Sequence, residues 1–208
     1  MRIEKIQPSP HKRERVLVFL EDGSLLRLTA ETVVRFDLHP GQELTQTLRE
    51  ELEQAQHAYQ IRSHGARMAS ERMLSKQELQ RRLERKGANE QEAAETADWL
   101  EELGAVDDGA YAAAIVQHYS RMGYGALRIR QELQRRGIPR ELWEEALCRL
   151  PHSGETIRAL LHSKTKGKPL DREQGRKLAA MLQRRGFTWQ EIRPELSAFL
   201  DGETLPEE

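Results

Sequence analysis

The stretch that decides the fold is LRIRQELQRRGI, residues 127–138. Ile129 and Leu133 lie four residues apart in it, two arginines follow, and Gly137 ends the run. Two further copies of this pattern end at Gly87 and Gly186, so the three glycines stand 50 and 49 residues apart. A period of this length is typical of a tandem helical array. Such an array offers a long surface with a repeated chemical group, which suits a polymeric partner better than a small substrate.

The composition indicates a helical protein of the cytoplasm. Of the 208 residues, 32% are charged, 38% are hydrophobic and 5% are aromatic, and the abundant Glu, Arg, Lys, Gln and Ala favour helix. No apolar run is long enough to span a membrane, and the amino terminus lacks the apolar core of a signal peptide. The single cysteine, Cys148, fits a reducing compartment, and its helical spacing to apolar neighbours predicts a packed thiol.

Charge is strongly segregated along the chain although the net charge is only −1. Residues 89–108 contain eight acidic side chains and no Lys or Arg. Residues 115–190 contain 16 Lys or Arg against 7 Asp or Glu. The middle of the chain should therefore attract an anionic surface, which the acidic stretches should repel.

The amino-terminal part predicts a small head over residues 1–42. Residues 12–28 alternate like a β-hairpin around a turn at 21–23, and a short helix begins near Thr29. His39-Pro40-Gly41 should break this short helix. An amphipathic helix follows, with Gly65 as a point where it could be interrupted.

Nine helices are predicted after the head, in three groups of three. Their expected ranges are 44–72, 75–86, 90–103; 108–121, 125–136, 139–149; 153–164, 172–185 and 188–199. The fold class is therefore mainly all-α: three tandem three-helix repeats in an elongated array, preceded by the β-hairpin head. The repeats would span residues 43–105, 106–150 and 151–200, with an acidic tail at 201–208.

Capping residues support these helix starts. Ser75 with Glu78 and Thr188 with Glu191 are capping boxes, and Asn89 with Glu92 is a weaker analogue. Asp107, Ser153 and Asp171 are further N-cap candidates, with Pro139 at a first helical position. For Asp107-Asp108 we favour a helix N-cap role over a metal or acid–base site, because the sequence shows no further residues that would complete such a site. Pro194 should shorten or kink the last helix.

The second helix of each group carries an outward basic face. The leucine or isoleucine positions of the pattern turn toward the core, so the position two before the glycine points to solvent. Arg side chains there suit carboxylates or phosphates, although cations in a last helical turn are also favoured by the helix dipole, by about 0.3–1 kcal/mol each. The candidate contacts are Arg81, Arg85, Lys86, Arg128, Arg130, Arg135, Arg136, Lys164, Lys166, Lys168, Lys177, Arg184 and Arg185.

Enzyme signatures are absent from the sequence. The seven histidines show no metal-binding spacing, and there is no P-loop, dinucleotide fingerprint or Gly-x-Ser-x-Gly. We therefore expect no enzymatic activity, no cofactor and no metal.

Three runs of this chain resemble the bacterial RecX family. They are ARMASERMLSKQELQRRLERKG (66–87), LGAVDDGAYA (103–112) and GYGALRIRQELQRRGI (123–138). The resemblance covers about residues 58–200; the third repeat is looser, with Pro194 a departure, and the head lies outside it. It implies a regulatory protein that binds the groove of the RecA–single-stranded DNA filament and inhibits recombinase and coprotease activity, without enzymatic activity or cofactor.

Two other interpretations remain open at this point. The chain could be a stand-alone helical DNA-binding protein of transcription-factor type, with steeply salt-dependent binding to DNA alone. It could also be an oligomeric scaffold held by the long helix 44–72. We expect a monomer whose partner is the RecA filament, with single- or double-stranded DNA as a further candidate partner.

Overall fold

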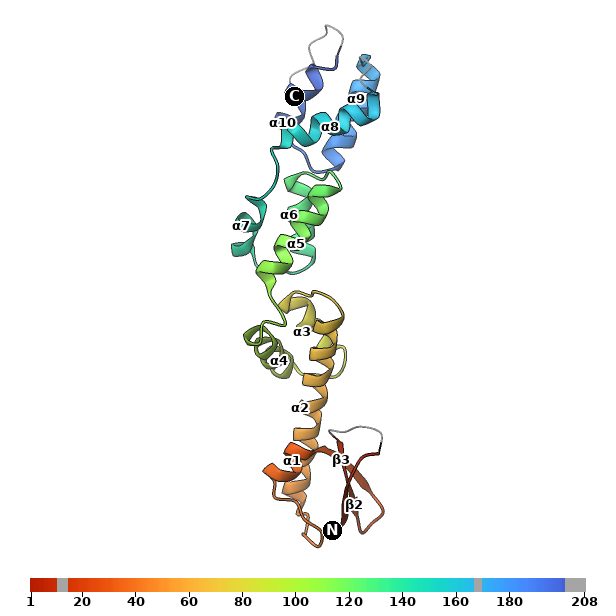
Figure 1. Ribbon diagram of the computed structural model, residues 1–208, viewed down its shortest axis with the longest axis vertical. Coiled ribbons are helices and arrows are strands. Elements are labelled where there is room, and N and C mark those ends of the chain that lie inside the picture. Colours follow the sequence, from red (N-terminus) through yellow and green to blue (C-terminus); the bar gives the residue numbers. More distant parts are fainter. Residues whose placement is uncertain (11–14, 167–169, 201–208) are drawn as a thin grey trace. The chain divides into compact units, whose positions relative to one another are not determined.

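The computed structural model describes residues 1–10, 15–166 and 170–200 (Figure 1). The chain divides into two compact units, Met1–Arg67 with Arg82–Thr96 and Met68–Arg81 with Ala97–Glu208. Within the described residues there are three strands, ten α-helices and one 3-10 turn. The predicted fold class, mainly helical with a small β head, is confirmed. The predicted repeat boundaries stay a prediction.

The head is a three-stranded antiparallel sheet in the order β1-β2-β3. The predicted hairpin is β2 (Arg15–Leu20) and β3 (Leu25–Thr29), joined by a turn in which the Asp22 carboxylate accepts a hydrogen bond from the Ser24 amide. Strand β1 (Ile3–Pro8) is absent from the prediction because its apolar residues do not alternate regularly. Helix α1 (Ala30–Arg35) begins next to Thr29 as predicted, and the Thr29 side chain caps it by accepting from the Thr32 amide.

A hydrophobic core packs the head against the start of the long helix α2 (Gln46–Glu71). Ile3, Val18, Leu20 and Leu28 pack together with Leu52 of α2. Helix α2 continues through Gly65, so there is no interruption at that residue.

Repeat one consists of α2, α3 (Lys76–Glu84) and α4 (Glu90–Glu102). Repeat two consists of α5 (Asp108–Arg121), α6 (Ala126–Arg135), the 3-10 turn η1 (Arg140–Leu142) and α7 (Trp143–Leu147). Repeat three consists of α8 (Ser153–Thr165), α9 (Arg172–Arg184) and α10 (Trp189–Ser197). The single helix predicted over 139–149 is wrong: Pro139 precedes a 3-10 turn, and only a short α-helix follows.

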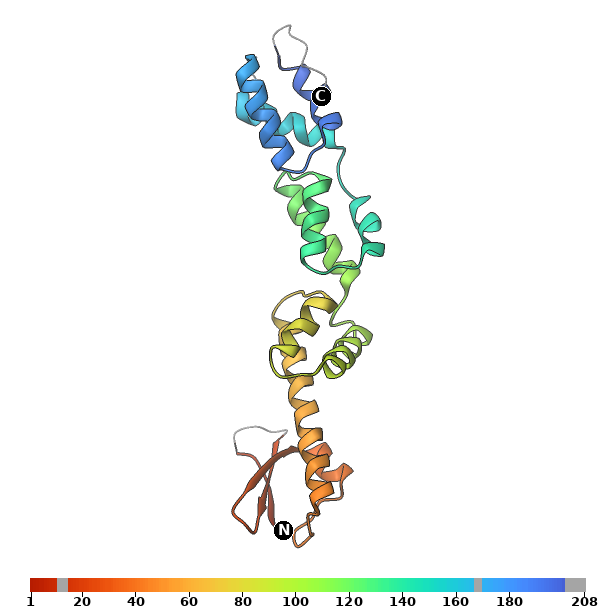
Figure 2. The same ribbon diagram turned by 180° about the vertical axis from the view of Figure 1, so that it is seen from behind.

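Repeats two and three each have their own core. Figure 2 shows the helices of repeat two in green to teal and those of repeat three in cyan to blue. In repeat two, the motif residues Ile129 and Leu133 pack with residues of α5 and α7. In repeat three, Leu182 of α9 packs with Ile157 of α8 and Ile192 of α10. Trp143 and Trp189 pack half-buried on these cores. Each repeat therefore buries its apolar stripes by bringing three helices together.

Most predicted caps are present. The Asp107 side chain accepts from the Ala110 amide, and complete capping boxes form at Asp171 and Thr188. Asn89 and Glu92 also bond in both directions, at 2.9 Å each. The N-cap of α8 is His152 rather than the predicted Ser153.

Three local features complete the description. Pro194 lies inside α10, which ends at Ser197. Cys148 is exposed, so the predicted packed thiol is wrong; its Sγ donates to the carbonyl of Glu145 at the end of α7. No helix within the described residues is long and apolar enough to cross a membrane.

Candidate functional site

The basic helices meet end to end. At the first joint, the carboxyl end of α6 meets the amino end of α3, where the Ser75 hydroxyl donates to the carbonyl of Arg136. The same hydroxyl accepts from the Glu78 amide at 3.0 Å, so Ser75 caps α3 while it holds α6. The second basic helix of the array is thus anchored to the start of the first.

The second joint repeats this arrangement one repeat further along the chain. The carboxyl end of α9 meets the amino end of α6, where the Gly125 amide donates to the Arg185 carbonyl at 2.8 Å. The Leu127 amide donates to the Gly186 carbonyl at 3.2 Å. These bonds pair amide groups left open at one helix start with carbonyls left open at another helix end. No side-chain cap is needed at Gly125, and none is present.

The second basic residue of each of these two motifs is bonded within the chain, Arg136 inside repeat two and Arg185 across the second joint. Arg136 is half-buried and donates to Glu132 and, at 2.8 Å, to the Tyr111 hydroxyl. Arg185 donates from Nη1 to the carbonyls of Met122 and Gly123, and its guanidinium lies 5.4 Å from the centre of the Tyr124 ring. Both arginines are among the predicted binding contacts, but the structure gives them bonds within the chain. Their side chains therefore support the local structure, and their role in binding stays a prediction.

Glu132 is the functional residue that the motif does not reveal. Its side chain is 3% exposed and accepts hydrogen bonds from both Arg135 and Arg136. Burial alone would raise the pKa of this carboxyl, but the two guanidinium groups outweigh burial and lower the pKa. The helical period gives one signal, because position 132 lies beside the core positions 129 and 133.

The remaining candidate cations fall into two classes. Those in the first class are neutralised by a carboxylate: Arg130 by Glu144 at 3.0 Å, Arg135 by Glu132 at 2.6 Å and Lys177 by Glu173 at 2.6 Å. Those in the second class are exposed and have no carboxylate partner among the described residues: Arg81, Arg85, Lys86, Arg128, Lys164, Lys166 and Arg184. Lys168 lies outside the described residues. Only the second class offers uncompensated charge to a partner.

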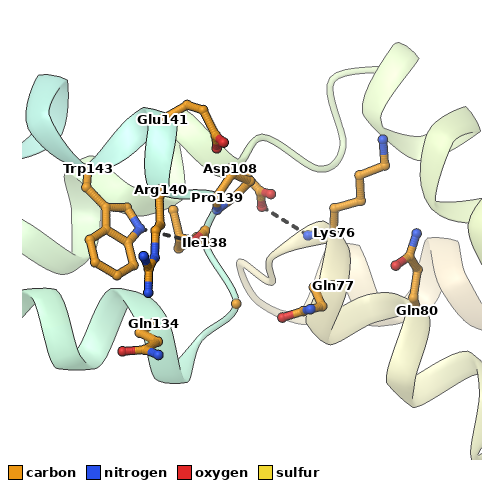
Figure 3. Close-up of a pocket in the computed structure, with 11 residues that line it drawn as sticks. Lys76, Gln77, Gln80, Asp108, Gln134, Ile138, Pro139, Arg140, Glu141 and Trp143 are labelled. Atoms are coloured by element: carbon orange, nitrogen blue, oxygen red, sulfur yellow. Dashed lines mark hydrogen bonds between the residues drawn. The ribbon is translucent and has the colours of Figure 1, made fainter.

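A polar cleft of about 480 Å³ opens at the first joint (Figure 3). The Lys76 amide at the start of α3 donates to the buried Asp108 carboxylate at 3.0 Å. The Lys76 ammonium pairs with Asp98 and Glu101, whose hydrogen bonds raise its pKa. On the other wall, Trp143 donates to the Ile138 carbonyl at 3.0 Å. Carboxylates therefore balance the cations at this joint.

Asp108 yields a prediction about pH. Burial raises the pKa of this carboxyl above its ordinary value of 3.8, although the Lys76 amide acts in the opposite direction. Because the folded pKa is raised, ionised Asp108 costs stability that grows as pH rises from the unfolded pKa through the folded one. Asp108→Asn keeps an oxygen for the Lys76 amide, so the free energy of unfolding should change by less than about 1 kcal/mol at pH 7.

Urea unfolding at pH 4 and pH 7 checks this prediction for Asp108→Asn. The stability of the variant should decline less than that of the wild type between the two pH values. A larger decline in the variant would contradict it.

Comparison with known proteins places this geometry in a family. Residues 107–147, from the cap of α5 to the end of α7, match the family model for RecX, second three-helix domain. A Regulatory protein RecX of Xanthomonas oryzae pv. oryzae is 36% identical over 121 residues, covering 57% of this chain and 76% of that protein. One of Halorhodospira halophila is 30% identical over 142 residues, covering 66% of this chain and 87% of that protein. This chain belongs to the RecX family.

Similarity to RecX proteins also extends to the head. A Regulatory protein RecX of Bacillus licheniformis is 29% identical over 199 residues and covers 93% of this chain and 76% of that protein. A crystal structure of regulatory protein RecX has a TM-score of 0.76 at 21% identity, covering 94% of this chain and 98% of that one. The crystal structure of RecX from Lactobacillus salivarius has a TM-score of 0.62 at 19% identity, and the match covers 70% of this chain and 97% of that one. The RecX fold thus includes the repeats described above, and the family is one of regulatory proteins.

Proposed function

We propose that this protein binds the RecA recombinase filament on single-stranded DNA and inhibits its strand-exchange and coprotease activities. The observation that carries the proposal is membership of the regulatory RecX family, shown by relatives that match over most of their length. The proposal includes a cytoplasmic location, no catalysis and no cofactor. A helical array with a repeated basic group suits a periodic protein–DNA polymer better than a small substrate.

The exposed cations without carboxylate partners are the proposed contacts. Each motif copy offers one such cation: Arg85 directly after α3, Arg184 at the end of α9, both two residues before their glycine, and Arg128 in the first turn of α6, nine residues before Gly137. None of the three has a carboxylate partner among the described residues, although Arg128 donates to the Gln131 side chain at 3.3 Å, so their charges suit acidic side chains of the filament or phosphates of its DNA. The acidic residues of α4, among them Glu90, Glu92 and Glu95, would keep that helix away from DNA. Occupying the filament groove would then hinder pairing with a second DNA.

Co-sedimentation tests the proposed function directly. The wild-type protein is mixed with preformed RecA–single-stranded DNA filaments, with DNA alone and with RecA alone. We expect it to sediment with the filaments and to reduce strand exchange. Sedimentation with DNA alone to the same extent, with a steep salt dependence, would support the stand-alone DNA-binding alternative instead.

A charge-reversal variant tests the proposed contacts. Arg85→Glu with Arg184→Glu should weaken filament binding at least tenfold, because two attractive charges become repulsive. Arg136 stays unchanged, because its bonds to Glu132 and Tyr111 connect α6 to α5 inside repeat two. The matched control reverses two exposed cations of the head, Lys5→Glu with Arg27→Glu. Equal weakening by the two variants would contradict the assignment to the basic helices.

A further inference from the structure

Two large apolar side chains are exposed at the second joint. Leu127 is 46% exposed on the first turn of α6, and Met122 is 49% exposed at the end of α5. Both belong to the joint through their backbones: the Leu127 amide donates to the Gly186 carbonyl, and the Met122 carbonyl accepts from Arg185. The joint therefore holds these residues in fixed positions while their side chains stay in water.

The outward leucine is a peculiarity of the second motif copy. The position ten before the motif glycine is Gln77 in the first copy, Leu127 in the second and Arg176 in the third. All three are exposed, so the repeat core does not require an apolar side chain there. A polar residue occupies this position in the first and third copies. The leucine of the second copy exposes apolar surface to water, and a partner protein would cover that surface.

Three arginines without a carboxylate partner among the described residues lie next to the two apolar residues in sequence or at the same joint. Arg121 directly precedes Met122, Arg128 directly follows Leu127, and Arg184 ends α9 at the same joint. An alanine side chain at Gly186 would lie only 2.5 Å from Cβ of Arg128, which places Arg128 beside the end of α9. No ion pair within the described part of the chain involves these three arginines. The first joint differs, because Asp98 and Glu101 neutralise Lys76 there and Glu132 neutralises Arg136.

We propose that the second joint is a protein-docking surface for an acidic partner segment with an apolar anchor, and this rests on the proposed function. Arginine and methionine are enriched in protein interfaces. Such interfaces usually have an apolar centre surrounded by a polar or charged rim. The exposed leucine and methionine favour a protein over a nucleic acid, whose phosphates would use the arginines alone. Tyr124, the aromatic ring at the joint, is half-buried under Arg185 and offers no platform for a base. The partner segment thus carries an apolar side chain flanked by carboxylates.

Removal of the apolar pair tests this surface. Met122→Ser with Leu127→Ser should weaken binding to RecA–single-stranded DNA filaments about tenfold or more, as expected for anchor residues at the centre of an interface. The control replaces two exposed apolar residues elsewhere, Met73→Ser with Leu103→Ser, which are 48% and 62% exposed. The control should bind like the wild type. Circular dichroism confirms that both variants keep the helical fold.

Each contrary result has a separate meaning. Wild-type binding by the Met122 and Leu127 variant, or equal weakening by the control, would overturn the docking surface and leave the proposed function intact. An equal loss of binding to fluorescent oligo(dT) without RecA would make nucleic acid the partner and overturn the proposal. A dilution-dependent mass that the variant abolishes would make a second copy the occupant, with the same consequence. Failure of the wild type to bind filaments would refute both the docking surface and the proposed function.

Discussion

Gly186→Ala is expected to lower the free energy of unfolding by about 3 kcal/mol and to open the second joint. The added Cβ would lie 2.5 Å from Cβ and 2.9 Å from Cα of Arg128, and the Gly186 backbone has a φ of +89°. The left-handed conformation costs a non-glycine residue about 1–2 kcal/mol, and overpacking against atoms that cannot rotate away costs about 1–3 kcal/mol. The helix start at Arg128 has no freedom to move, because Gly125 and Leu127 are bonded to α9.

The other two copies of the motif supply matched controls. A Cβ at Gly87 meets nothing within 4 Å, so Gly87→Ala should cost only the backbone term, about 1 kcal/mol. A Cβ at Gly137 meets mainly the Gln77 side chain, which can turn away. The loss of unfolding free energy in Gly137→Ala should therefore lie between the losses in Gly87→Ala and Gly186→Ala. Urea unfolding ranks the three variants, and amide exchange in α6 and α9 reports the opening of the joint. Equal losses at Gly87 and Gly186 would show that the joint adds no packing constraint.

Local signals explain why the helices could be predicted. Helix α5 has the predicted bounds, 108–121, because Asp107 caps its start and the glycine after Met122 ends it. Helices α3, α6 and α9 differ from prediction by one or two residues at their ends. Strand β1 pairs with the next strand, β2, but its own residues show no alternation that indicates a strand. The prediction of one helix over 139–149 was wrong for a local reason, because the segment begins with a 3-10 turn rather than an α-helical turn.

The joints depend on residues too far apart for a periodic pattern to connect. Ser75 and Arg136 are 61 positions apart, and Arg185 and Met122 are 63 apart. Helical periodicity correctly predicts that Arg135 and Arg184 are exposed, but it does not predict their partners. Whether the arginine has a carboxylate partner depends on the residue five before the glycine, which is Glu132 in the second copy and Met181 in the third. One arginine is therefore neutralised while its counterpart stays available to a partner.

Glu132→Ala is expected to lower the free energy of unfolding by about 3 kcal/mol at pH 7. Glu132 is buried and accepts three charge-assisted hydrogen bonds, two from Arg135 and one from Arg136. Removing one partner of a buried ion pair leaves the other charge uncompensated, here the half-buried Arg136 that also holds Tyr111. The matched control is Glu144→Ala, which removes the partner of Arg130. Because Glu144 is 76% exposed, its loss should cost less than about 1 kcal/mol.

The pH dependence separates the ion pair from simple packing. Because the folded pKa of Glu132 is lowered from its ordinary value of 4.5, its stabilisation is complete above that value and is lost as pH falls through the folded pKa. The difference in unfolding free energy between wild type and Glu132→Ala should therefore shrink between pH 6 and pH 3, as measured by urea titration. The lowered pKa of Glu191 acts in the same acidic range, but it is present in both proteins and cancels in this difference. A difference that stays constant with pH would mean that Glu132 supports the joint through its volume rather than its charge.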